Sequence, residues 1–129
     1  SDIVATDFDG DGKLEILTFS KFHGDTLAIW HEGQTRDRYE QVWCDPQKRS
    51  FLHALWAADL NGEKCAVIGN RKDGRDLLLV RYVDGEYTVD VIDHDLGPAN
   101  CMVYRHDGSD YIVAAYRETD QLALYKVVE

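Results

Sequence analysis

Residues 3–19 read IVATDFDGDGKLEILTF, two short apolar runs joined by a loop with an acid at almost every second position. The runs at 3–6 and 16–19 are rich in apolar and β-branched residues, which is typical of strands. The loop between them places carboxylates at its relative positions 1, 3, 5 and 9, with glycine between. This stretch predicts a strand-to-strand connection built around a hard cation.

Calcium takes about six to eight oxygen ligands and accepts carboxylates mixed with backbone carbonyls. Gly10 and Gly12 allow the chain to fold back around an ion through backbone angles that a Cβ disfavours. The loop differs from an EF-hand, which needs flanking helices and a Glu at its twelfth position, where this chain has Thr18. The alternative is an acidic turn without metal. The expected calcium ligands are Asp7, Asp9, Asp11, the carbonyl of Lys13, and Glu15.

Composition limits the classes of partner. The chain has 129 residues, enough for one domain, and carries 24 acids against 14 bases for a net charge of −10. Such a surface disfavours a nucleic-acid backbone and favours cations. No apolar run reaches the length of a membrane span, so we expect no membrane insertion. The three cysteines show no zinc-site spacing, and Cys65 and Cys101 lie in apolar runs typical of a core.

The chain repeats itself. Residues 53–62 align with residues 1–10, and residues 66–70 align with residues 16–20. A third copy continues with residues 111–115 and 122–125. The repeat units are about 1–45, 46–95 and 96–129 within a single array.

Each unit reads as short strands separated by turns, a pattern of antiparallel sheet. In the second unit the predicted strands are 54–58, 65–70, 77–82 and 87–92, with turns at Asn61-Gly62, Asp73-Gly74 and Asp84-Gly85. The continuous apolar run at 77–80 indicates burial on both faces, and the alternation of Tyr87, Val89 and Val91 with polar residues indicates a half-exposed outer strand. A four-stranded unit of this length predicts an all-β fold, a β-propeller section of about three four-stranded antiparallel blades, the last incomplete.

The motifs IVATDFDGDGKLEIL at 3–17 and HALWAADLNG at 53–62 resemble the FG-GAP/VCBS repeats of integrin-α-like propellers. The resemblance covers essentially the whole chain and implies calcium at the same five loop residues. The other units depart from the pattern. The second unit has Ala66 or Val67 where the ninth-position acid belongs, and in the third Arg105, Asp107 and Asp110 are out of register. We therefore expect metal only in the first unit.

A ring of such blades needs about four to eight units. Three units would leave apolar sheet faces uncovered, which favours aggregation. We expect the chain to be part of a larger propeller, or to complete itself as a homo-oligomer, since two copies would supply six blades.

Outside the loop, His53 and Trp56 are candidate ligand-binding residues on the innermost strand of the second unit. A backbone-bonded structural histidine and a packing tryptophan are the alternatives. Propellers that resemble this family, such as aldos-2-ulose dehydratases and certain polysaccharide lyases, use histidines near the channel, and Asn100 and Glu118 could join His53. His31 is expected at the surface.

The sequence thus predicts a calcium-binding scaffold module for a protein or carbohydrate ligand, with no catalytic residue assigned. The alternative is part of a propeller enzyme acting on sugars, of lyase or dehydratase type. The resemblance implies an extracellular or cell-surface location, with the cytoplasm left open.

Overall fold

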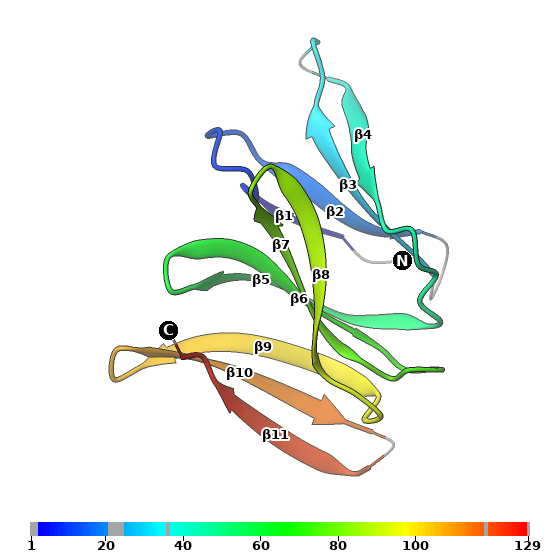
Figure 1. The fold of residues 1–129 in the computed structure, drawn as a ribbon, viewed down its shortest axis with the longest axis vertical. Coiled ribbons are helices and arrows are strands. Elements are labelled where there is room, and N and C mark those ends of the chain that lie inside the picture. The colour runs from blue at the N-terminus through cyan, green and yellow to red at the C-terminus, as the bar shows by residue number, and fades with distance from the viewer. Residues whose placement is uncertain (1–2, 21–24, 36, 118, 129) are drawn as a thin grey trace.

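A computed structural model describes residues 3–20, 25–35, 37–117 and 119–128 (Figure 1). Within each sheet every strand pairs antiparallel with the next one in the chain, and the sheets have four, four and three strands. The predicted all-β fold is confirmed, and no helix in the described ranges is long or apolar enough to cross a membrane. The strands are β1 (Ile3–Thr6), β2 (Glu15–Ser20), β3 (Thr26–Glu32), β4 (Tyr39–Cys44), β5 (Leu52–Leu60), β6 (Glu63–Asn70), β7 (Leu77–Val83), β8 (Glu86–Asp93), β9 (Pro98–His106), β10 (Ser109–Tyr116) and β11 (Gln121–Lys126).

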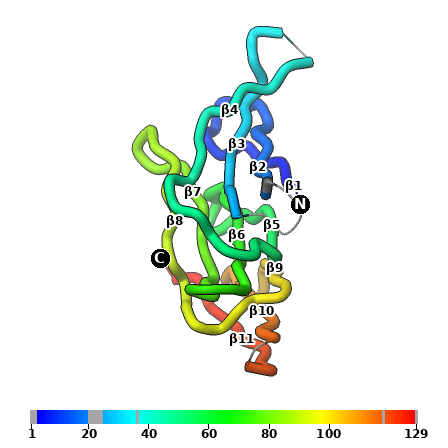
Figure 2. The backbone as a smooth tube through the Cα atoms, turned by 90° about the vertical axis from the view of Figure 1, so that its right-hand side faces the viewer, coloured from blue at the N-terminus to red at the C-terminus, as the bar shows by residue number. Residues whose placement is uncertain are grey.

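The three sheets follow one another along the long axis of the molecule, with the β5–β8 sheet in the middle (Figures 1 and 2). Two apolar cores lie between them. The first core joins the β1–β4 and β5–β8 sheets through residues such as Leu17, Ile29 and Ile68. The second joins the β5–β8 and β9–β11 sheets through residues such as Val67, Leu77 and Ile112. The identity of these sheets as propeller blades stays a prediction.

The middle sheet is buried on both faces, as the apolar run of its central strands predicts. Side chains alternate between the faces of a strand. On β6, Ala66 and Ile68 therefore enter the first core, while Cys65 and Val67 enter the second. On β7, Leu78 and Val80 enter the first core in the same way, and all of these residues are almost fully buried.

The four strands predicted for the second unit are all present, each extended by up to two residues at an end. Asn61-Gly62 is confirmed as a two-residue hairpin turn, with φ of 53° and 81°. The turn predicted at Asp73-Gly74 is also present, closed by the Arg75 N–H that donates to the Lys72 carbonyl, but it lies within the longer connection between β6 and β7 and does not join these strands directly.

The half-exposed outer strand is confirmed only in part. Tyr87 and Val89 pack against the first core, but Val91 is 55% exposed. A register shift in the β7–β8 pairing lies between Leu77 and Leu78, and Ile92 packs against the second core. Such a bulge ends a simple alternation.

Candidate metal centre

The β1–β2 loop is held by its own carboxylates. Both oxygens of Asp7 accept backbone N–H groups, from Gly10 and from Gly12, each at 2.9 Å. Gly10 and Gly12 have φ of 75° and 86° with open space around the missing Cβ. Glycine is therefore needed there for backbone conformation and not for room. The loop tightens further through N–H groups donated to Asp9 and Asp11 from the residue two positions later.

Glu15, the first residue of β2, is fully buried and faces the middle sheet. Its Oε1 accepts the N–H of Asp9 at 3.0 Å, and its Oε2 accepts the hydroxyl of Tyr87 on β8. Burial, followed by the Glu15 carboxylate, raises the pKa of the Tyr87 hydroxyl. The Tyr87 hydroxyl therefore keeps its proton and donates it in a hydrogen bond to Glu15. This bond holds the last acid of the loop against the neighbouring sheet.

Carboxylate oxygens of Asp7, Asp9 and Glu15 lie within 4.8 Å of one another. Partial burial raises the pKa of Asp9 to about 6, and the nearby charges of Glu15 and Asp11 add to this rise. Without a cation the loop therefore holds one carboxylate that resists ionisation. A divalent cation would relieve this repulsion.

His31, near the end of β3, lies against the same loop. Its Nε2 is 2.7 Å from Asp11 Oδ2 and 3.8 Å from Asp9 Oδ2, and its Nδ1 is 2.8 Å from the Glu32 carbonyl. Because both ring nitrogens face acceptors, the doubly protonated ring is favoured. The Glu32 carbonyl, and after it Asp11, raises the pKa of His31. The surface position expected for His31 holds in part, since about a fifth of its side chain is exposed while the ring lies against the loop acids.

The donor set fits a hard cation at the predicted residues. Asp7, Asp9 and Glu15 offer oxygen alone, which calcium prefers, whereas the neighbouring group of Asp9, Asp11 and His31 includes a nitrogen that calcium does not favour. The structure thus brings four of the five predicted ligands into two groups that share Asp9. Lys13 takes part through its N–H, which donates to Asp11 at 2.8 Å, and the role of its carbonyl stays a prediction.

The corresponding turns of the other sheets neutralise their acids with bases. Asp59 pairs with Lys64 at 2.7 Å, and Asp110 pairs with Arg105 at 3.0 Å while accepting the Asn61 N–H at 2.7 Å. Among the described residues, groups of three metal-ligating side chains occur only around the first loop.

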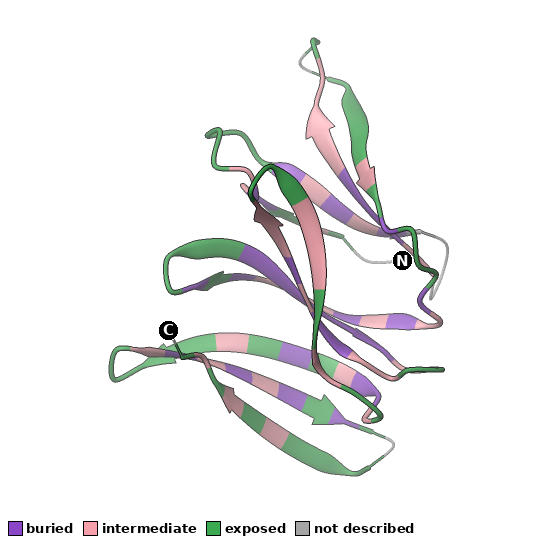
Figure 3. Cartoon of the chain, viewed as in Figure 1, coloured by how far each residue is buried: buried purple, intermediate pink, exposed green. Residues whose placement is uncertain are grey.

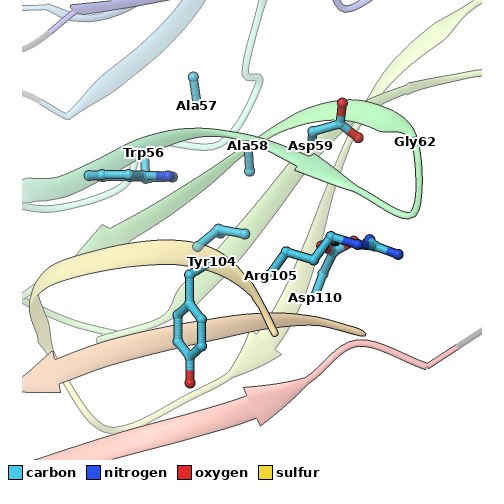
Figure 4. A pocket seen from close by; sticks show the side chains of 9 residues that line it. Trp56, Ala57, Ala58, Asp59, Gly62, Tyr104, Arg105 and Asp110 are labelled. Carbon is cyan, nitrogen blue, oxygen red and sulfur yellow. Dashed lines mark hydrogen bonds and ion pairs between the residues drawn. The ribbon is translucent and has the colours of Figure 1, made fainter. Parts of the chain in front are cut away.

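His53 and Trp56 both lie on β5, and the structure gives them different surroundings. His53 Nδ1 lies 2.7 Å from the Ala99 carbonyl, and its ring stacks on Phe51. Trp56 is 40% exposed and lines a cleft of about 560 Å³ between the middle and last sheets. In this cleft the Tyr104 side chain points away from Trp56, and Arg105 lies beside Asp110 (Figure 4).

The other predicted partners of His53 gain no role. Asn100 accepts the N–H of Cys101 through its side-chain oxygen. Glu118 lies outside the described residues.

A second cleft, of about 570 Å³, opens between the first two sheets beside the metal loop. Its lining includes Asp9 and His31 from the first sheet and Tyr82, Glu86 and Tyr87 from the second. His31 and Tyr87 are site residues that were not predicted from the sequence. The signal that could find them is strand register, since β2–β3 pairing places His31 directly opposite Glu15.

Comparisons with protein families, with characterised proteins and with solved structures found no match to this chain.

Proposed function

We propose that this chain is a calcium-binding section of a β-propeller that serves as a scaffold for a protein or carbohydrate ligand. The observation that carries the proposal is the grouping of the Asp7, Asp9 and Glu15 carboxylates within 4.8 Å in a glycine-shaped loop. The three-fold repeat and the stacking of its sheets support the propeller architecture.

Calcium would be held by Asp7, Asp9, Asp11, the Lys13 carbonyl and Glu15. Its contribution is stability, because an ion that binds the folded loop and not the unfolded chain favours folding. Glu15 extends this effect beyond the loop. Its contact with Tyr87 joins the loop to the middle sheet, so that the ion would fix two sheets relative to each other.

Ligand binding is supported by Trp56. A tryptophan face that is 40% exposed beside a cleft can stack on a sugar ring or anchor a protein side chain. The enzyme alternative depends on His53 as a catalyst. Its contacts with the Ala99 carbonyl and the Phe51 ring are those of a structural histidine, so the binding role is the better supported of the two.

The test is thermal and urea unfolding in EDTA and in calcium. At calcium one hundred times Kd, the free energy of unfolding is expected to rise by about 2.7 kcal/mol. Magnesium is expected to stabilise less, because it demands a smaller octahedral site.

Asp9→Asn makes the test specific. The amide keeps an oxygen that accepts the Asp11 N–H. It removes the negative charge of the one residue that belongs to both clusters of candidate ligands. We expect the EDTA form of the variant to be at least as stable as the wild type, because repulsion is relieved, while the calcium effect is lost. Asp59→Asn is the matched control, since this acid pairs with Lys64 in the equivalent turn. Equal melting of the wild type in calcium and EDTA would contradict the site.

A further inference from the structure

The two end sheets of the stack each leave an apolar face uncovered. On β10, Ile112 and Ala114 enter the second core, so Val113 between them points outward. Val113 pairs with Met102 on β9 and with Leu124 on β11, which therefore share its side. We define the outer face of the β9–β11 sheet by its outward side chains, Met102, Tyr104, Val113, Leu122 and Leu124.

Four of these five side chains are exposed, and Val113 is half-buried. Leu122 is 76% exposed and Leu124 is 57% exposed, beside Met102 at 40% and Tyr104 at 38%. Figure 3 shows β9 and β11 with alternating exposed and less exposed segments. An apolar surface of this continuity on a sheet marks an interaction site.

The opposite end of the molecule has a matching surface. On β2, Leu17 and Phe19 enter the first core, so Ile16 and Thr18 point outward. Ile16 pairs with Trp30 on β3, and Thr18 pairs with Ile3 on β1. We define the outer face of the β1–β4 sheet as Ile3, Ile16, Thr18 and Trp30.

The repeat shows what covers each face. In every sheet the second and third strands in chain order carry two equivalent cross-strand pairs, one on each side. On one side these are Leu17–Ile29, Val67–Leu79 and Val113–Leu124. On the other side they are Ile16–Trp30, Ala66–Val80 and Ile112–Tyr125.

Inside the molecule, pairs of the first kind always meet pairs of the second kind. Leu17–Ile29 shares the first core with Ala66–Val80, and Val67–Leu79 shares the second core with Ile112–Tyr125. The pairs left over are Val113–Leu124 at one end and Ile16–Trp30 at the other. The uncovered pair at each end is therefore of the kind that packs against the uncovered pair at the other end.

We propose that the outer face of the β9–β11 sheet packs against the outer face of the β1–β4 sheet of a second copy of this chain. Two such contacts, related by a two-fold axis, close a ring of six sheets. The six sheets of two copies lie within the range of about four to eight that a closed ring takes. The inference rests on the propeller architecture proposed above but not on calcium.

Light scattering on the purified chain tests this inference. We expect a mass of twice 14.7 kDa, in EDTA as well as in calcium, so that failure of the calcium site leaves the result unchanged. Leu124→Glu and Ile3→Lys each place a charge on one outer face at a strongly exposed position. Each variant alone is expected to be a monomer. Val91→Glu, on β8 and 55% exposed but on neither outer face, is the matched control and is expected to stay a dimer.

Mixing the two monomeric variants identifies which faces meet. The intact β9–β11 face of Ile3→Lys can pack on the intact β1–β4 face of Leu124→Glu, and opposite charges approach at the second contact. We therefore expect the mixture to recover the mass of two chains, which also shows that both variants are folded. A monomeric wild type, an open-ended polymer, or a mixture that stays monomeric would overturn the proposal. A monomeric wild type would indicate that a polypeptide segment other than a second copy of this chain covers the two outer faces.

Discussion

At the residue scale, buried carboxylates connect the sheets. Glu15 joins the first sheet to the second through Tyr87, and Asp110 joins the third to the second through the N–H of Asn61. A buried ionised acid is costly unless it is fully hydrogen-bonded. Each of these acids has partners from two parts of the chain, so the contacts between sheets include charge-assisted hydrogen bonds as well as apolar packing.

Asp110 makes stability depend on pH. The Asn61 N–H, and after it the Arg105 guanidinium, lowers the pKa of the Asp110 carboxyl. The unfolded chain then binds this proton more tightly than the folded state does. The stabilisation is present in full above the ordinary aspartate pKa of about 3.9 and is lost as the pH falls through the folded pKa. We expect the wild type to exceed Asp110→Asn in free energy of unfolding at neutral pH, and the difference to shrink below about pH 4.

Asp107→Asn is the control for this measurement by urea unfolding. Asp107 lies in the same hairpin, but its side chain is 87% exposed in a surface pair with His106. We expect little effect of this variant at any pH, because exposed ion pairs contribute little. A stability difference for Asp110→Asn that stays constant down to acid pH would rule out the carboxylate as its source.

At the element scale, strands and hairpin turns could be predicted because their signals are local. The central strands are continuous apolar runs, and the Asn-Gly and Asp-Gly turns take the positive φ values that such residues favour. The exposure of Val91 could not be predicted, since it depends on an irregularity in β7–β8 pairing. The loop carboxylates were found because they are close in sequence. His31 and Tyr87 lie 20 and 72 residues from their partners in the loop, and only the folded register brings them there.

Gly69 on β6 sets how closely the second and third sheets approach. A Cβ there would lie 2.8 Å from Pro98 Cβ and 3.1 Å from Ala54 Cβ, and it would meet Pro98 Cγ more closely still. Gly69→Ala is therefore expected to lower the free energy of unfolding by about 1–3 kcal/mol, as overpacking of a filled core does. Urea unfolding measures the loss.

The Pro98→Ala background tests the cause of that loss. Because the proline ring supplies the closest clash, Gly69→Ala should cost less when Pro98 is already alanine, with a coupling of at least about 0.5 kcal/mol. An additive double variant would show that Gly69 is needed for some other reason.

At the scale of the whole molecule, the repeat predicts the succession of the sheets but not how many faces of each sheet are buried. The middle sheet has neighbours on both faces, and each end sheet has a neighbour on one. Each core therefore lies between the middle sheet and an end sheet with one uncovered side. The second core contains two buried cysteines, so its opening can be followed chemically.

The three cysteines report on that opening. Cys44 is exposed, whereas Cys65 and Cys101 lie on facing sheets in the second core, where burial raises the pKa of each thiol to about 12. Thiolate is the reactive form, so a thiol reagent should label Cys44 rapidly and the other two slowly. Because separation of these two sheets uncovers both buried thiols together, Cys65 and Cys101 are expected to share one rate constant in native conditions. Cys44→Ser should remove the fast phase alone, and two distinct slow rates would mean that the second core opens in parts.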